Sequence, residues 1–181
     1  MNTTKLATLS STRAAFDEII TNIHLFEPHD PLNINYRHSG ALRECVTYYF
    51  NGRGSLSEVT SNQITGYQGT DTLCLTWAAV VEAKNLINPL RNIGRAYVTM
   101  LSPNGQIYPH ADQHGHDGYF DRVDRYQLFF DSNSDLINLV DGIRYMPASD
   151  ELWYLEHDKV HQYTNNGNRP IVFAVFDLFK Y

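Results

Sequence analysis

The chain has 181 residues, of which 43% are hydrophobic and 19% are charged, and its formal net charge is −6 at pH 7. This negative charge argues against a broad nucleic-acid-binding surface, which needs clustered Lys and Arg. No apolar run approaches the roughly 20 residues that cross a bilayer, and the N-terminal segment lacks the apolar stretch of a secretory signal. We therefore expect a cytoplasmic protein with neither a membrane nor a nucleic acid as partner.

Two helices are predicted in the first half of the chain. Apolar residues recur at helical spacing over residues 11–23 and again over residues 73–88, which is typical of amphipathic helices. Between them, residues 44–50 are rich in strand formers, and residues 51–70 are polar and contain several glycines. We expect this last stretch to be a long loop.

Short strand patterns fill the second half of the chain. Asp141 and Gly142 separate two of them, which is a hairpin signal. Several short antiparallel strands predict a sandwich or barrel. We expect residues 1–181 to form one domain, in which residues 1–94 are a helical and loop part that packs on the sheets of residues 95–181. The predicted strands have the sequences RAYVTML, IYPHAD, RYQLFF, INLV, IRYM, LWYLE, VHQYT and PIVFAVFDLF.

A group of histidine and acidic residues lies in the stretch IYPHADQHGHDGYF, residues 107–120. His110 and Asp112 are two positions apart, so their side chains point to the same face if the segment is extended. Two imidazoles and one carboxylate form the ligand set of mononuclear iron oxygenases. His161, in another predicted strand, is the best candidate for the third ligand. His157, on the preceding loop, is a weaker rival that we expect to be a solvated turn residue.

His114 and His116 form a second pair with the same spacing, of the kind that metal-binding cupins use. They lie in a glycine-rich segment that we expect to be a loop, and loops place ligands less accurately than strands do. We expect these histidines to contact substrate or to be exposed, and we expect Tyr119 to contact substrate. The two long loops, 51–70 and 113–124, are expected to form the substrate rim.

Four blocks between residues 95 and 177 resemble the aspartyl/asparaginyl β-hydroxylase branch of the Fe(II)- and 2-oxoglutarate-dependent oxygenases. This resemblance implies a mostly β fold with flanking helices, namely a double-stranded β helix (a cupin-like jelly roll) buttressed by N-terminal helices. It also implies an Fe(II) ion held by His110, Asp112 and His161. The blocks are RAYVTMLSPNGQIYPHAD, DRYQLFF, ELWYLEHDKVHQYTN and PIVFAVFDL.

The resemblance further implies a pocket for 2-oxoglutarate, whose far carboxylate pairs in this superfamily with a basic residue on a late strand. A guanidinium suits that task because its planar donors grip a carboxylate with two bonds. The family position falls on Ile171, so we expect Arg169, two residues earlier and on the same face if the stretch is extended, to take this role. Arg125 matches a second basic position of the cofactor pocket, and we expect Gln127 to line it as well.

The activity implied is hydroxylation of a C–H bond. Fe(II) is bound, 2-oxoglutarate and O2 are consumed, and succinate and CO2 are released, with ascorbate as reductant. The family name suggests the β carbon of Asp or Asn, in a peptide or a free amino acid, and no catalytic side chain beyond the metal ligands is expected. Two alternatives stay open. One is a cupin-like, non-catalytic metal- or ligand-binding protein that uses His114 and His116; the other is an oxygenase fold without cosubstrate binding that serves as an interaction module.

Overall fold

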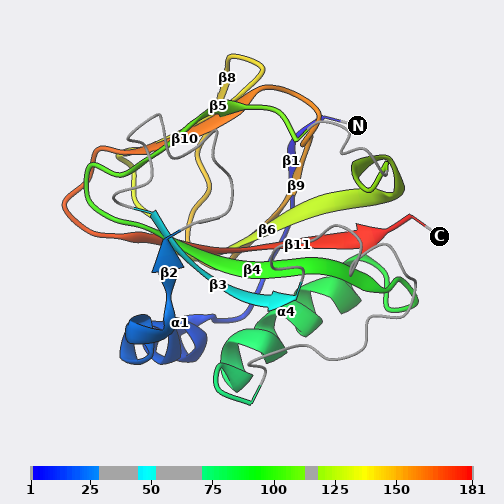
Figure 1. Ribbon diagram of the computed structural model, residues 1–181, viewed down its shortest axis with the longest axis horizontal. Helices are drawn as coiled ribbons and strands as arrows, with labels where there is room; N and C mark the ends of the chain where they lie inside the picture. Colours follow the sequence, from blue (N-terminus) through cyan, green and yellow to red (C-terminus); the bar gives the residue numbers. More distant parts are fainter. Residues whose placement is uncertain (1, 29–44, 52–70, 113–117, 181) are drawn as a thin grey trace.

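The computed structural model describes residues 2–28, 45–51, 71–112 and 118–180, and most of them form β-strands (Figure 1). The helical elements are α1 (Arg13–Thr21), η1 (Ile23–Leu25), α4 (Cys74–Ile87) and η3 (Phe120–Arg122). The strands are β1 (Thr4–Thr8), β2 (Glu27–Pro28), β3 (Cys45–Asn51), β4 (Ile93–Leu101), β5 (Gln106–His110), β6 (Val123–Asp131), β7 (Leu136–Val140), β8 (Ile143–Tyr145), β9 (Glu151–Leu155), β10 (His161–Asn165) and β11 (Ile171–Phe179).

The strands form two antiparallel sheets that face each other. The larger has the order β1-β9-β6-β11-β4-β3-β2 and the smaller the order β5-β10-β7-β8. From β4 onward the chain passes back and forth between the two sheets, with only β7 and β8 following each other in the same sheet, which is the winding of a jelly roll. The predicted double-stranded β helix is therefore confirmed. The predicted hairpin between β7 and β8 is also present, because Asp141 and Gly142 both have positive φ, at 51° and 76°, as a two-residue turn of type I′ requires.

β11 shows how the sequence builds two cores on one strand. All nine of its residues are buried, and successive side chains point to opposite faces. One row packs toward the helices and consists of Val172, Ala174, Phe176 and Leu178. The other row packs between the two sheets and consists of Ile171, Phe173 and Val175. Asp177 continues this second row and is the one charged residue of the strand.

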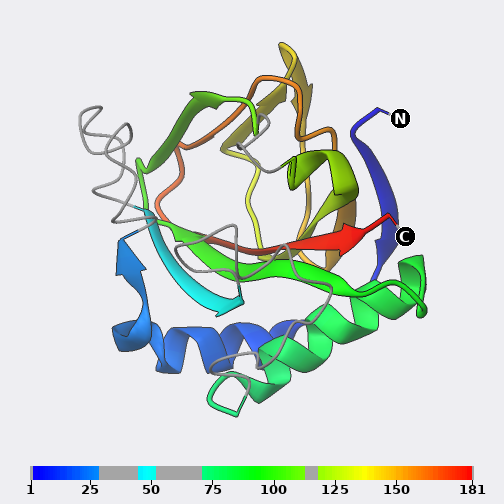
Figure 2. The same cartoon turned by 45° about the vertical axis from the view of Figure 1, so that its right-hand side comes forward.

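The two long helices cover the outer face of the larger sheet, below β3, β4 and β11 in both views (Figures 1 and 2). Their apolar faces meet the sheet in a core that includes Ile19, Val80 and Phe50. No helix in the described ranges is both long and apolar enough to cross a membrane.

The described N-terminal part contains strands as well as the expected helices and loops, and one of them, β3, falls on the segment that is rich in strand formers. β1 pairs with β9 at one edge of the larger sheet, and β2 and β3 extend the opposite edge beyond β4. The segment TKLAT of β1 has four residues that are exposed, so its pattern lacks the apolar alternation by which a strand is recognised. β1 is held by main-chain pairing to β9 more than by burial of its own side chains.

Candidate metal centre

Two histidines meet where neighbouring strands of the smaller sheet come together. His110 ends β5 and His161 begins β10, and the two residues are direct partners in the antiparallel register. Their ring centroids are 4.3 Å apart. Cross-strand partners place their side chains on the same face, so the pairing of these two strands is what brings the imidazoles together.

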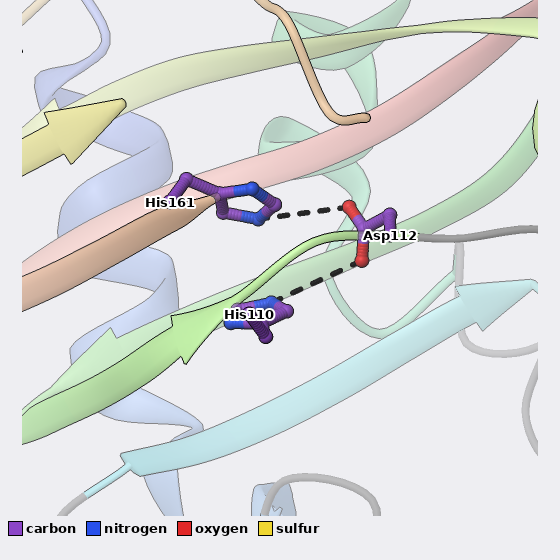
Figure 3. Close-up of side chains that lie close together, drawn as sticks. All are labelled: His110, Asp112 and His161. Atoms are coloured by element: carbon purple, nitrogen blue, oxygen red, sulfur yellow. Dashed lines mark ion pairs between the residues drawn. The ribbon is translucent and has the colours of Figure 1, made fainter. Parts of the chain in front are cut away.

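Asp112 completes the group from a position two residues beyond the end of β5 (Figure 3). Its Oδ1 lies 3.9 Å from Nε2 of His110 and its Oδ2 lies 3.6 Å from Nε2 of His161. One ligand atom from each of the three residues lies within 4.8 Å of the others. β5 ends before Asp112, so strand pairing does not hold this residue. Its backbone N–H instead donates to the carbonyl oxygen of His157 at 2.9 Å.

The orientation of both imidazole rings suits metal binding. Nδ1 of His110 lies 2.7 Å from the carbonyl oxygen of Tyr108, and Nδ1 of His161 lies 2.9 Å from that of Lys159. A carbonyl only accepts, so each Nδ1 carries the proton in these bonds and Nε2 keeps its lone pair. Histidine ligands of metals commonly have this arrangement, in which the outer ring nitrogen donates to a carbonyl.

The protonation states also match a metal site. Burial opposes ionisation of Asp112, but the Arg125 guanidinium and the nearby histidines outweigh it and lower the pKa of this carboxyl. Burial lowers the pKa of His161 to about 4, although Asp112 acts in the opposite direction. At neutral pH the group therefore holds an ionised carboxylate and a neutral imidazole, the forms that bind a metal ion.

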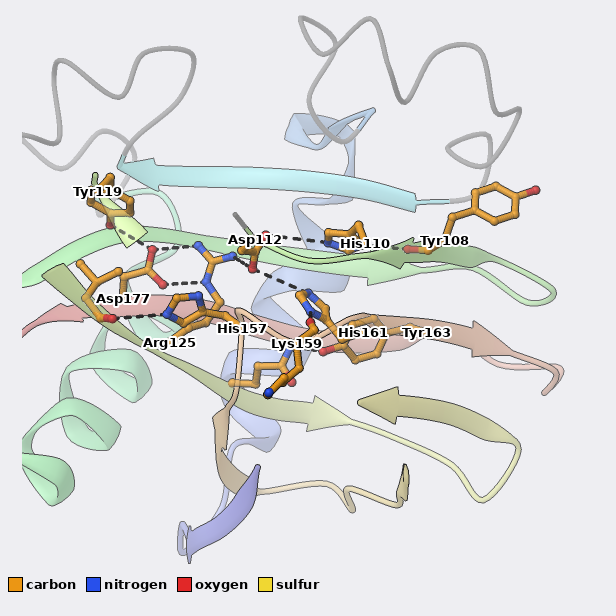
Figure 4. Close-up of polar contacts among 12 residues, drawn as sticks. Tyr108, His110, Asp112, Tyr119, Arg125, His157, Lys159, His161, Tyr163 and Asp177 are labelled. Atoms are coloured by element: carbon orange, nitrogen blue, oxygen red, sulfur yellow. Dashed lines mark hydrogen bonds and ion pairs between the residues drawn. The ribbon is translucent and has the colours of Figure 1, made fainter. Parts of the chain in front are cut away.

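The guanidinium of Arg125 lies between Asp112 and Asp177 (Figure 4). Its Nη1 donates to Oδ2 of Asp112 at 2.5 Å, while its Nε and Nη2 donate to the two oxygens of Asp177 at 2.7 and 2.8 Å. Burial lowers the pKa of Arg125, but Asp112 and Asp177 dominate and raise it well above its usual value. Of the Lys and Arg residues in the described part of the chain, Arg125 alone is buried.

Of the two other residues expected in the 2-oxoglutarate pocket, Gln127 is buried and Arg169 is exposed. Gln127 is buried two positions along β6 from Arg125, and its Nε2 donates to Oη of Tyr163 at 2.6 Å. Arg169 does not lie beside these residues. Its side chain is 62% exposed, and its Nη1 is 3.9 Å from Oδ2 of Asp131. The expectation of an extended stretch fails because β11 begins only at Ile171, and Asn165 binds the carbonyl oxygen of Arg169 within the turn.

Other predicted residues have mixed outcomes. His114 and His116 lie outside the described residues, as does most of the loop 51–70. Tyr119, expected to contact substrate, is fully buried, and its hydroxyl donates to Oδ2 of Asp177 at 2.9 Å. His157, expected to be solvated, is buried against Phe120. It contributes a main-chain carbonyl to Asp112 and no ligand atom to the metal group.

Asp177 was missed as a site residue, although the sequence contains a signal for it. It is the one ionisable residue in the nine-residue apolar run IVFAVFDLF, and a charge in a fully buried strand needs a partner. Its partner is Arg125, which lies opposite it in the register of β11 and β6. Since 52 residues separate the two, only the strand pairing reveals the contact.

Comparison with known proteins bears on the fold. No protein family and no curated protein matches this sequence. Among solved structures, a prolyl hydroxylase from Trichoplax adhaerens, in complex with a hypoxia inducible factor oxygen degradation domain peptide fragment, aligns with a TM-score of 0.63 at 10% identity, covering 98% of this chain and 83% of that chain. A Pseudomonas putida prolyl-4-hydroxylase aligns with a TM-score of 0.61 at 13% identity, covering 99% and 93%.

A third structure is the viral collagen prolyl hydroxylase of Paramecium Bursaria Chlorella virus-1 in complex with 2OG. It aligns with a TM-score of 0.53 at 10% identity and covers 100% of this chain and 97% of that chain. At these identities the likeness defines a class of fold, the double-stranded β helix seen in prolyl hydroxylases, over the whole chain. His110, Asp112 and His161 lie together within this fold.

Proposed function

We propose that this protein is an Fe(II)- and 2-oxoglutarate-dependent dioxygenase that hydroxylates a C–H bond of its substrate. The observation that carries the proposal is the convergence of His110, Asp112 and His161 within a double-stranded β helix. Two imidazoles and one carboxylate on one side of a metal are typical of iron oxygenases that keep other coordination positions open. The prolyl hydroxylase fold of the solved neighbours supports the same class.

The residues present fit an Fe(II) ion. Both Nε2 atoms keep their lone pairs because the Nδ1 atoms bind carbonyl oxygens, and Asp112 is held in its ionised form. When bound, iron and 2-oxoglutarate supply the oxidising chemistry, in which O2 and 2-oxoglutarate become succinate, CO2 and the oxygen atom of the new hydroxyl group. The protein holds the three ligands in place and encloses their inner side with buried residues of β6 and β11.

The cosubstrate is proposed to lie in the interior beside Arg125 and Gln127. A guanidinium has five N–H donors, and three hydrogen bonds to Asp112 and Asp177 leave two N–H groups of Arg125 for another carboxylate. The positive charge of Arg125 is already opposed by two carboxylates. Neutral donors are therefore expected to contribute more to cosubstrate binding here than a lone arginine does, and the hydroxyl group of Tyr163, bound to Gln127, is the first candidate.

The substrate class follows from two resemblances of different kinds. The sequence blocks around the metal ligands resemble aspartyl/asparaginyl β-hydroxylases, whereas the solved neighbours are named as prolyl hydroxylases, one of them with a peptide bound. Both classes hydroxylate an amino acid side chain. We therefore propose an amino acid residue in a peptide, or a free amino acid, as substrate, with the β carbon of Asp or Asn as the first position to test.

Turnover of 2-oxoglutarate tests the proposal directly. The purified protein with Fe(II), O2 and ascorbate is expected to form succinate slowly alone and faster with a matching peptide, whose mass increases by one oxygen atom. His110→Ala, Asp112→Ala and His161→Ala should each abolish succinate formation because each removes one of three ligands. His157→Gln is the matched control, since His157 is also buried next to Asp112 but offers no ligand atom, and it should stay active.

The same assay decides between the alternatives. A protein that binds metal through His114 and His116 and forms no succinate is a cupin-like binding protein, and then His114→Ala and His116→Ala would remove the metal while His161→Ala would not. The cosubstrate assignment has its own measurement. Arg169→Met should leave the KM for 2-oxoglutarate within about twofold, because this side chain is mostly exposed, whereas Tyr163→Phe should raise it by about 2- to 10-fold, the value of one hydrogen bond.

A further inference from the structure

We propose that Arg125 is a positioning residue for Asp112, and that Asp177 and Tyr119 fix Arg125 in that role; this inference rests on the proposed function of the same site. The four side chains form one continuous buried chain of hydrogen bonds that ends on the predicted metal ligand (Figure 4). Partners of this kind, which touch a ligand but no metal, orient the ligand and tune its affinity for the ion.

Asp112 needs such a partner because its backbone position is weakly determined. The residue lies two positions beyond the end of β5, and among the described residues its main chain has one hydrogen bond, from its N–H to the carbonyl oxygen of His157. The carboxylate can rotate about two side-chain torsions. The bond from Nη1 of Arg125 to Oδ2, at 2.5 Å, removes that freedom and leaves Oδ1 as the oxygen without a guanidinium contact.

Arg125 is itself enclosed on three sides. Asp177 binds its Nε and Nη2 in the paired geometry that aligns a planar guanidinium with a planar carboxylate. The ring of Phe120 covers one face, with its centroid 5.1 Å from Cζ of Arg125. The side chain of Arg125 is 4% exposed and that of Asp177 is 0% exposed, so the pair excludes water and holds one geometry.

Tyr119 completes the chain of hydrogen bonds. Its hydroxyl donates to Oδ2 of Asp177 at 2.9 Å and accepts from the backbone N–H of Arg95 at 2.8 Å. This places the hydroxyl against the backbone of β4, at a point where Gly94 has no Cβ to obstruct it. Asp177 thus receives donors from β6 and from the segment just before η3, and its orientation is fixed from both.

Metal affinity measures this positioning without reference to turnover. Asp177→Asn keeps the size of the side chain but removes the charge and one of the two acceptors for Arg125. We expect Asp177→Asn to weaken Mn(II) binding, followed by the electron paramagnetic resonance signal of free Mn(II), by about 10- to 100-fold. The visible absorption of bound Co(II) should also change, because it reports ligand geometry and a purely structural role would leave it unaltered.

A matched control lies on the same strand. Asp124, one residue before Arg125 on the other face of β6, pairs with Arg91 at 2.8 Å and touches none of the three predicted ligands. Asp124→Asn therefore removes a paired carboxylate from β6 and should leave Mn(II) affinity within about twofold. Tyr119→Phe removes a single oxygen atom and should weaken Mn(II) binding by about 2- to 10-fold, the value of one hydrogen bond.

Each outcome bears on a different conclusion. If Asp177→Asn and Tyr119→Phe fold and bind Mn(II) with wild-type affinity and an unchanged Co(II) spectrum, the positioning role is wrong while the proposed oxygenase function stands. Should Asp177→Asn fail to fold by circular dichroism, Tyr119→Phe decides the matter alone. If the wild-type protein binds neither Mn(II) nor Co(II), the proposed function fails and the positioning role fails with it.

Discussion

Gly94 and the hydroxyl group of Tyr119 lie so close together that a methyl group on Gly94 would not fit between them. A Cβ atom on Gly94 would lie 2.5 Å from the hydroxyl oxygen of Tyr119 and 3.5 Å from Cβ of Asp177. The first distance is far below ordinary van der Waals contact. Gly94 is therefore required by the position of the Tyr119 hydroxyl, and the two residues act as a pair.

This pairing predicts a rescue between two substitutions. Gly94→Ala should lower the free energy of unfolding by about 1–3 kcal/mol, the usual cost of overpacking a core. Adding Tyr119→Phe removes the clashing oxygen, so the double variant should be more stable than the sum of the two single changes predicts. Urea denaturation of all four proteins measures this. Strictly additive effects would show that the hydroxyl does not lie against Gly94.

The ligands themselves were predictable from local spacing, but their supporting residues were not. His110 and Asp112 stand out because they are two positions apart in a predicted strand, whereas His161 was expected from its place in another predicted strand and from the family resemblance. The expectation for Arg169 was wrong because it assumed that the extended stretch begins before Ile171, and the local sequence does not show where β11 begins. The burial of His157 depends on packing against Phe120, a contact between segments far apart in the sequence that no local pattern encodes.

At the level of elements, α4 begins without a capping side chain of its own. Its N-cap residue is Leu73, and no side chain from that position binds the first turn. Glu18 of α1 replaces it: the backbone N–H groups of Leu75 and Thr76 donate to its two carboxylate oxygens at 3.0 and 2.7 Å. A carboxylate at a helix N-terminus binds unpaired N–H groups and interacts favourably with the helix dipole.

Glu18 should therefore join the two helices in a pH-dependent way. Burial opposes ionisation, but hydrogen bonds from Thr76 and Leu75 prevail and lower its pKa in the folded protein. A lowered folded pKa means that the stabilisation is fully present above the unfolded value of about 4.3 and is lost as the pH falls through the folded value. Glu18→Gln should cost about 1 kcal/mol at pH 7, and the difference from wild type should shrink below about pH 4.

The adjacent residue provides the control for this measurement. Asp17 forms an exposed pair with Arg13 at 2.8 Å on the same helix, and such pairs contribute about 0.3–0.5 kcal/mol. Asp17→Asn should therefore change the free energy of unfolding by less than Glu18→Gln in urea denaturation at pH 7. Equal effects would mean that the general charge of α1, rather than the cap, stabilises α4.

Strands with regular apolar rows and strands next to a turn signal were predicted, whereas β1, which has neither, was not. The nine-residue strands β4, β6 and β11 contain regular apolar rows, and the sequence blocks that include them were read as strands. β1 has mostly exposed side chains, so only its hydrogen bonds to β9 define it. The order of strands within each sheet is likewise a property of long-range pairing.

For the whole molecule, metal binding should stabilise the fold, because three ligands from two strands and a loop must come together to bind the ion. A ligand at about 100 times its Kd adds about 2.7 kcal/mol to the free energy of unfolding, which for a domain of this size raises Tm by about 5–10 °C. Thermal unfolding with and without Mn(II) measures the shift. His161→Ala should abolish it, and an equal shift in that variant would place the ion elsewhere.

β11 follows all the other strands in the sequence yet lies between β6 and β4 in the middle of the larger sheet. On the ribosome, β4 and β6 are therefore made long before the strand that joins them. Until then they expose unpaired edges and apolar faces, which favour aggregation of nascent chains. Asp177, the carboxylate that pairs with Arg125, belongs to β11 and is therefore also made late. If the site binds iron as proposed, the charged pair that positions Asp112 is complete only after β11 has been synthesised.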